Sequence, residues 1–202
     1  MTEGSKALEA VVLAAGAGVR FGGGKLMTPL SGSGVLLDGA LAAGFAAPVR
    51  TVAVVWGADD RVPAAAGRFA AEIGVAERLR LVHADRCAEG LAQSLKAGIA
   101  SLPADADGVF VFLGDMPRVP RQAAQDLARA LDAGASAAAP VFGGRRGHPV
   151  LFGASLFPQL AALDGDRGAA AVLDGLGQAL ALVPAEDDGV LFDVDLPADL
   201  TS

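Results

Sequence analysis

The sequence has little of several residues on which common kinds of protein depend. Among its 202 residues it holds one cysteine, Cys87, and two histidines, His83 and His148. A single cysteine excludes a disulfide framework, and no group of cysteine and histidine has the spacing of a zinc site. Two histidines are also too few for a histidine-rich metal site.

Basic charge and long apolar runs are scarce as well. Lysine and arginine total 16 against 23 aspartates and glutamates, which gives a net charge of −7. A duplex-binding protein needs a basic face, so no nucleic-acid partner is expected. Glycine, proline or charge interrupts every apolar stretch before the roughly 18 residues of a membrane span. We therefore expect a cytoplasmic protein with no membrane partner, although residues 6–19 leave a short signal peptide as the alternative.

What the sequence does have is an alternation of strand-like and helix-like segments. Strands are expected at 11–13, 51–56, 81–82, 109–113, 137–141, 149–152, 179–183 and 190–194, and helices at 36–45, 61–73, 91–102 and 120–133. This alternation predicts an α/β fold with a largely parallel sheet. The length suits one domain spanning 1–202. Ligands of such sheets bind beyond the carboxyl ends of the strands, which makes the residues after each strand the candidates for function.

A glycine-rich loop follows the first expected strand. Residues 13–25 read LAAGAGVRFGGGK. The glycines allow backbone N–H groups to close on phosphate oxygens, and Arg20 and Lys25 add positive charge. The loop is neither a Walker loop, which would need glycine at Val19, nor a dinucleotide fingerprint, which would need glycine at Phe21. The alternative interpretation is a flexible turn without a ligand.

A carboxylate follows the most apolar expected strand. Asp115 lies in the segment LGDMP at 113–117, directly after the strand at 109–113. A carboxylate at this edge is a natural Mg²⁺ ligand, because Mg²⁺ usually takes one or two carboxylates together with substrate phosphates. A turn aspartate, or a cap for the helix after Pro120, is the structural alternative.

These segments, in this order, resemble the motifs of the MobA/MocA-like NTP transferases. The loop resembles LAAGxSxRxGxxK, LGDMP resembles LGDxP, and DVDLPADL at 193–200 resembles DVDTPEDL. The resemblance extends from Val11 to Leu200. It implies a Rossmann-like three-layer sandwich of the nucleotide-diphospho-sugar transferase type. It also implies transfer of a nucleoside monophosphate from an NTP to a phosphorylated small-molecule acceptor, with release of pyrophosphate.

The resemblance assigns roles to individual residues of this chain. It implies catalytic roles for Arg20, Lys25 and Asp115, and Mg²⁺ as the cofactor, held by Asp115 and Asp195. Through the glycine-rich loop it implies nucleotide binding by Leu13, Ala14, Ala15, Gly16, Gly18, Arg20 and Lys25, and through GLAQSL at 90–95, which resembles GMSSSL, by Gly90 and Ser94. Through GHPVLF and a segment like GDxGAR, it implies acceptor binding by Arg145, His148 and Asp166. A structural histidine and turn or capping aspartates remain the alternatives for His148, Asp166 and Asp195.

The chain departs from the family pattern at four places. Ala84 stands where the family often begins Asn-Pro-Asp-Trp, and Gln93 interrupts the serine run. Ala170 replaces the arginine of GDxGAR, and residues 31–36 lack the lysine of the family's GKPL. These departures leave the base and the acceptor open.

The likeness is nearer to one branch of the family than to another. LAAG and LGDMP resemble the molybdopterin cytidylyltransferases, whereas the guanylyltransferase branch usually opens with LAGG. CTP and molybdopterin are therefore the expected substrates, and a molybdoenzyme or its chaperone is the partner that this interpretation suggests. Three alternatives stay open: a sugar-phosphate acceptor, an NAD(P)H-dependent reductase like nicotine blue oxidoreductase, and a non-catalytic nucleotide-binding subunit.

Overall fold

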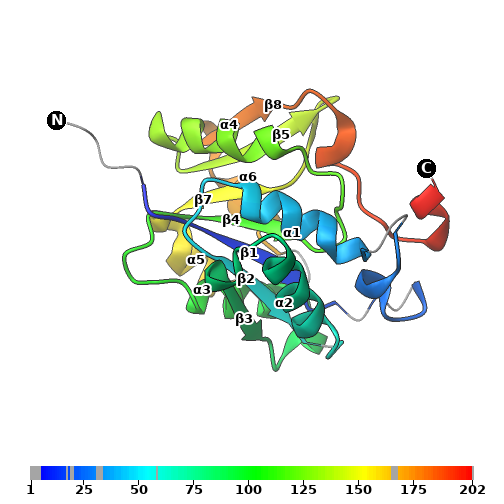
Figure 1. Cartoon of the computed structure of the whole chain (residues 1–202). Coiled ribbons are helices and arrows are strands. Elements are labelled where there is room, and N and C mark those ends of the chain that lie inside the picture. The colour runs from blue at the N-terminus through cyan, green and yellow to red at the C-terminus, as the bar shows by residue number, and fades with distance from the viewer. Residues whose placement is uncertain are drawn as a thin grey trace.

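A computed structural model gives the arrangement of the chain (Figure 1). The structure describes residues 6–16, 18, 21–30, 34–57, 59–164 and 168–201. Two of the predicted site residues, Arg20 and Asp166, lie outside these described residues. None of the helices in the described ranges is long and apolar enough to cross a membrane.

The described strands form one sheet. Its path is β3-β2-β1-β4-β7-β5-β6, with β8 paired to β5. Strands β1, β2, β3 and β4 are mutually parallel, β8 is parallel to β5, and β7 runs antiparallel to β4 and β5. Their bounds are β1 Leu8–Ala14, β2 Val52–Trp56, β3 Leu79–His83, β4 Gly108–Leu113, β5 Ala137–Phe142, β6 Arg145–Arg146, β7 Val150–Gly153 and β8 Leu180–Pro184.

Helices cover both faces of this sheet (Figure 1). One core packs α1 (Leu36–Ala46), α2 (Val62–Glu72) and α4 (Arg121–Asp132) against one face. A second core packs α3 (Leu91–Ala100), α5 (Phe157–Ala161) and α6 (Ala170–Gly175) against the other. Strand β1 is buried at all seven positions because both of its faces are covered, as is usual for central parallel strands. The predicted three-layer α/β fold with a mostly parallel sheet is confirmed.

One predicted strand is wrong. Four of the five residues at 190–194 are apolar, yet a short 3-10 turn occupies Asp188–Val190 and the described residues after it, 191–201, form no strand. The carboxylate of Asp187 accepts the N–H of Gly189 at 2.8 Å, and the N–H of Val194 donates to the carbonyl of Asp115 at 3.1 Å. The backbone N–H groups of this segment therefore bond to a capping side chain and to loop carbonyls, and not to a neighbouring strand.

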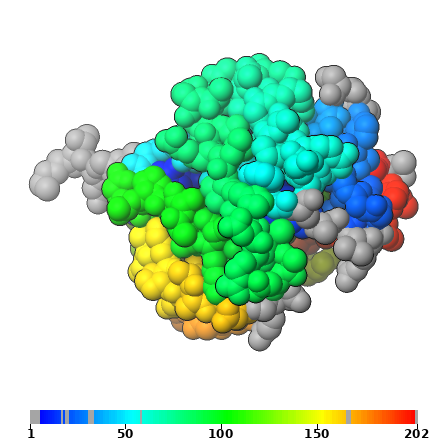
Figure 2. All heavy atoms as spheres, turned by 90° about the horizontal axis from the view of Figure 1, so that it is seen from below, coloured from blue at the N-terminus to red at the C-terminus, as the bar shows by residue number. Residues whose placement is uncertain are grey.

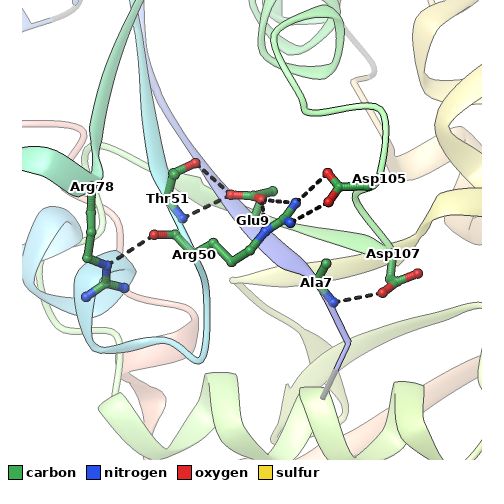
Figure 3. Close-up of polar contacts among 7 residues, drawn as sticks. All are labelled: Ala7, Glu9, Arg50, Thr51, Arg78, Asp105 and Asp107. Atoms are coloured by element: carbon green, nitrogen blue, oxygen red, sulfur yellow. Dashed lines mark hydrogen bonds and ion pairs between the residues drawn. The ribbon is translucent and has the colours of Figure 1, made fainter. Parts of the chain in front are cut away.

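A buried carboxylate ties the amino ends of the central strands together (Figure 3). Glu9 of β1 is only 1% exposed. It accepts hydrogen bonds from Nε of Arg50 at 2.6 Å and from the N–H and hydroxyl of Thr51 at 3.0 and 2.6 Å. Arg50 also contacts Asp105 at 2.7 and 3.0 Å, and Asp105 and Glu9 raise the pKa of its guanidinium. This network joins β1, the start of β2 and the segment before β4, at the edge opposite to the carboxyl ends of the strands.

Helix α3 lies very close to the sheet because it carries Gly98. A Cβ at this position would lie 2.7 Å from Cγ1 of Val11 and 3.2 Å from Cγ2 of Val55. We expect Gly98→Ala to lower the free energy of unfolding by about 1–3 kcal/mol through overpacking. Gly67→Ala in α2, where a Cβ would meet nothing within 4 Å, should instead raise it by about 0.5–1 kcal/mol. Urea denaturation of both variants measures the difference, and equal effects would contradict the close packing of α3.

Candidate active site

A cavity of about 480 Å³ opens at the carboxyl ends of β1 and β4, the edge where ligands were predicted. Its wall brings together every predicted nucleotide-binding residue within the described ranges. These are Leu13, Ala14, Ala15, Gly16, Gly18, Lys25, Gly90 and Ser94, with Asp115 beside them. Cys87 also lines the cavity, and no sequence pattern had indicated it. Gln93, one of the departures from the family pattern, is not part of this wall.

Glycine geometry shapes the loop that forms one side of the cavity. Gly18 has φ +59°, and its carbonyl accepts the N–H groups of Phe21 at 2.9 Å and Gly23 at 3.0 Å. A Cβ on Gly18 would approach Cβ of Lys25 to 3.1 Å. Gly24, at φ +64°, begins the short 3-10 turn Lys25–Met27, whose Leu26 is buried. The loop thus folds back on itself and holds Lys25 against the cavity.

Lys25 lies between two carboxylates that are distant in sequence. Its Nζ is 2.7 Å from Oδ2 of Asp115 and 3.6 Å from Oδ1 of Asp195. Asp195 reaches this position because the neighbouring Val194 is buried and bonds to the backbone of Asp115. Figures 1 and 2 both place the blue segment around Lys25 beside the red C-terminal segment. The site is therefore assembled from the beginning, middle and end of the chain.

A third carboxylate adds negative charge at the same place. Burial, together with the charges of Asp195 and Asp115, raises the pKa of Asp193. Sequence reasoning did not single out Asp193, although it opens the same motif as Asp195. Repulsion among these groups is relieved by a cation, and the Lys25 ammonium already lies between Asp115 and Asp195. The donor set therefore fits a hard cation such as Mg²⁺.

The protein offers only part of a metal's coordination shell. Among the described residues, no three His, Cys, Asp or Glu side chains are grouped closely enough to hold a metal by themselves. Mg²⁺ is usually held in this way, with one or two carboxylates from the protein and the remaining positions taken by water and substrate phosphates. The arrangement therefore suits a metal that arrives with, or is completed by, a phosphorylated ligand.

The first turn of α3 forms the opposite side of the cavity. Gly90 is its N-cap at φ +115°, and Ser94 is buried at 4% exposure. The first N–H groups of a helix have no partner within the helix, so this end favours an anion or a polar ligand atom. Close packing at Gly98 fixes the helix on the sheet and hence the position of Gly90.

A second cavity, of about 230 Å³, adjoins the first, and Leu91 and Leu113 belong to both walls. His148, predicted to bind the acceptor, lines this second cavity together with Arg146. Arg145, also predicted to bind the acceptor, lines a separate open groove beside Phe142 and Phe192. Neighbouring residues of a strand point to opposite faces, which separates Arg145 from Arg146 in β6.

His148 gives the stability of the protein a dependence on pH. Burial lowers the pKa of its imidazole, against smaller opposing effects of the Val111 carbonyl, Asp115 and Asp193. The unfolded chain therefore binds more protons than the folded chain below about pH 6.5. As pH falls below that value, His148 should lower the free energy of unfolding by at most about 1.4 kcal/mol per pH unit, until the folded-state pKa is reached.

Urea denaturation between pH 7.5 and 5.5 measures this effect. His148→Gln should have a smaller loss of stability over that range than the wild type. His83→Gln, which removes an exposed histidine, is the matched control for the loss of an imidazole. Identical slopes in the wild type and His148→Gln would contradict a buried neutral imidazole.

Comparison with solved structures places the fold among nucleotidyltransferases. The chain is 29% identical to the Mycobacterium sp. strain JC1 homologue of Mycobacterium tuberculosis Rv0371c, with a TM-score of 0.76, and the match covers 96% of this chain and 93% of that one. A nucleotidyl transferase from Methanothermobacter, Mth528, is 23% identical, with a TM-score of 0.75 and coverages of 96% and 94%. Rv0371c of Mycobacterium tuberculosis in complex with manganese is 22% identical, with a TM-score of 0.67 and coverages of 89% and 89%.

Sequence comparison gives the family. A search of curated proteins found no significant match. The family model of the MobA-like NTP transferase domain, however, matches residues 10–182, which include most of β1, all of β4 and every residue that lines the first cavity. The chain therefore belongs to the MobA-like NTP transferase family.

Proposed function

We propose that the chain is an Mg²⁺-dependent enzyme that transfers a nucleoside monophosphate from an NTP to a phosphorylated acceptor and releases pyrophosphate. The observation that carries this proposal is the position of Lys25. Its Nζ lies between the carboxylates of Asp115 and Asp195, at the wall of a cavity that also contains the glycine loop. A triphosphate and its metal ion are bound by such a combination of a cation, carboxylates and backbone N–H donors.

Charge is the main obstacle to the proposed reaction. An acceptor phosphate attacks the α-phosphorus of the NTP, and both reactants are anions. Lys25, with the backbone N–H groups of the glycine loop, would neutralise the triphosphate and stabilise the charge that builds up in the transition state. Arg20 would add a second cation from the same loop. A phosphate nucleophile is already ionised at neutral pH, so no general base is required.

Asp115 and Asp195 would hold the metal ion. When bound, Mg²⁺ supplies Lewis-acid charge to the phosphate oxygens. Three observations support a divalent cation here. Asp115 and Asp195 lie around one ammonium group, and the carboxyl group of Asp193 is nearby. The similar protein Rv0371c has been solved in complex with manganese. When the nucleotide binds, the ammonium group of Lys25 would then leave one of these carboxylates and contact a substrate phosphate.

CTP and molybdopterin are the substrates that we propose. Their support is the likeness of LAAG at 13–16 and LGDMP at 113–117 to the molybdopterin cytidylyltransferase branch. The acceptor would approach from the second cavity, beside His148. This reaction would take place in the cytoplasm, and a molybdoenzyme or its chaperone would receive the product.

Pyrophosphate release tests the proposal. The protein is incubated with Mg²⁺ and molybdopterin, and CTP, GTP, ATP and UTP are offered in separate reactions. We expect release that depends on both the metal and the acceptor and is fastest with CTP. If release is fastest with another nucleotide, the protein is still a nucleotidyltransferase, but its preferred base is not cytosine. Absence of release with all four, with NADPH oxidised in the presence of a dye, would favour the reductase instead.

A further inference from the structure

Asp195 lies on an exposed turn and not on a helix or strand. The residue before it, Val194, is 1% exposed, and its N–H donates to the carbonyl of Asp115 at 3.1 Å. The residue after it, Leu196, is 52% exposed. Packing of Val194 therefore fixes the chain before Asp195 but not after it.

The ammonium group of Lys25 gives Asp195 little further support. Nζ of Lys25 is 2.7 Å from Oδ2 of Asp115, a hydrogen-bond distance, but 3.6 Å from Oδ1 of Asp195. The side chain of Asp195 is also 55% exposed, so water screens this contact. Asp115 and Asp195 carry like charges and repel each other. A restraint on the backbone of Asp195 would oppose this repulsion.

The carboxylate of Asp199 forms such a restraint. Its Oδ2 accepts the N–H of Asp195 at 2.9 Å and the N–H of Leu196 at 2.7 Å. The N–H of Asp199 donates in turn to the carbonyl of Leu196 at 3.0 Å. Pro197, which has no N–H, begins the 3-10 turn Pro197–Thr201. Asp199 is the third residue of this turn and reaches back to the backbone before it, as the acidic residue of a capping box does.

From these contacts we infer that Asp199 is a positioning residue of the metal site. Its carboxylate fixes the backbone of Asp195 and so keeps the Asp195 carboxylate near Asp115, where the two can bind one metal ion. Two backbone N–H groups already occupy Oδ2 of Asp199, so Asp199 acts through Asp195. The inference rests on the proposed function, because it takes Asp195 as a metal ligand.

The C-terminal segment contains a second carboxylate cap, at Asp187, which serves as a control. Oδ1 of Asp187 accepts the N–H of Gly189 at 2.8 Å. Further along, the carbonyl of Val190 accepts the N–H of His148 at 2.8 Å and holds the chain between this cap and Asp195. Loss of the Asp187 cap should therefore leave Asp195 in place.

Binding of Mn²⁺ alone, followed by EPR of the full chain without nucleotide, tests the inference. Asp199→Ala should weaken Mn²⁺ binding about three- to tenfold, the effect of losing hydrogen bonds that hold a ligand in place. Asp199→Asn, whose amide oxygen can still accept both N–H groups, should bind Mn²⁺ within about twofold of the wild type. Asp187→Ala should bind Mn²⁺ as the wild type does.

A double variant separates positioning from a general loss of structure. Asp195→Ala alone should weaken Mn²⁺ binding more than Asp199→Ala does, because it removes the ligand itself. Adding Asp199→Ala to Asp195→Ala should cause no further loss, since both substitutions act on one ligand. If the two residues contributed independently, their effects on the dissociation constant would multiply.

Several results would overturn the inference. One is an unchanged Mn²⁺ affinity in Asp199→Ala, and another is an absence of Mn²⁺ binding by the wild type at millimolar concentration. Equal losses in Asp199→Asn and Asp199→Ala would show that charge matters and the hydrogen bonds do not. An equal loss in Asp187→Ala would indicate loosening of the whole segment, and losses that multiply in the double variant would indicate two separate effects.

The outcomes separate this inference from the proposed function, because Mn²⁺ binding is measured without substrates. If Asp199→Ala weakens Mn²⁺ binding as expected but no NTP releases pyrophosphate, the positioning role stands and the transferase is rejected. If pyrophosphate is released but Asp199→Ala binds Mn²⁺ as the wild type does, the protein is a transferase and Asp199 has no positioning role.

Discussion

Asp115→Asn will lower kcat for pyrophosphate release by about 10²–10³-fold, the usual loss when a group that stabilises transition-state charge is removed. The substitution keeps the size of the side chain and removes its charge. Lys25 Nζ then loses the carboxylate that holds it at 2.7 Å, and the metal loses one of its two protein ligands. Nucleotide binding should be largely kept, since the glycine loop and the first turn of α3 are unchanged.

Steady-state kinetics and a nucleotide titration of the same preparation separate the two effects. Asp132→Asn removes a carboxylate that pairs with Lys6 at the far end of α4, and is the matched control. It should leave kcat unchanged. An unaltered kcat in Asp115→Asn would reject Asp115 as a metal-binding carboxylate, and equal losses in both variants would point to a general charge effect.

Glu9→Ala will lower the free energy of unfolding by about 3 kcal/mol, because hydrogen bonds to a charged acceptor are strong and their donors are left unpaired. The N–H and hydroxyl of Thr51 both lose the carboxylate (Figure 3). Arg50 keeps Asp105 and its contact with water, so its charge adds little to the loss. The effect should appear as a lower urea midpoint with an unchanged slope.

Asp105→Asn is the matched control for this network. Asp105 contacts the same guanidinium but is 70% exposed, so its removal should change the urea midpoint far less than Glu9→Ala does. A similar shift in the two variants would mean that the ion pair with Arg50, and not the buried bonds to Thr51, stabilises the strands. Activity per folded molecule should be unchanged in both, since the network lies at the edge of the sheet opposite to the cavity.

Much of the architecture could be predicted because it depends on local patterns. The segment 109–113 is apolar at every position, as is expected for a strand that is covered on both faces. It forms β4 of the structure. The rule that ligands bind at the carboxyl edge then placed Asp115 and the glycine loop together, as the cavity wall has them. Lys25 follows from the loop, because its glycines turn the chain back toward the sheet.

Other features depend on contacts that no local pattern contains. The apolar run at 190–194 predicts a strand, but the N–H of Val194 donates to the carbonyl of Asp115. This bond places the next residue, Asp195, beside Lys25. The difference between Arg145 and Arg146 depends on which face of β6 meets α6. The unpartnered Nδ1 of His148 appears only once β4 and β7 have been packed beside it.

A nucleotidyltransferase transfers the α-phosphorus of the nucleotide, whereas a kinase transfers the γ-phosphorus. Two samples of CTP, one labelled at the α-phosphate and one at the γ-phosphate, distinguish the two when each is incubated with Mg²⁺, molybdopterin and the protein. We expect the α label in the acceptor product and the γ label in pyrophosphate. A γ label in the acceptor would indicate a kinase. If neither label leaves CTP, nucleotidyl transfer to this acceptor is contradicted.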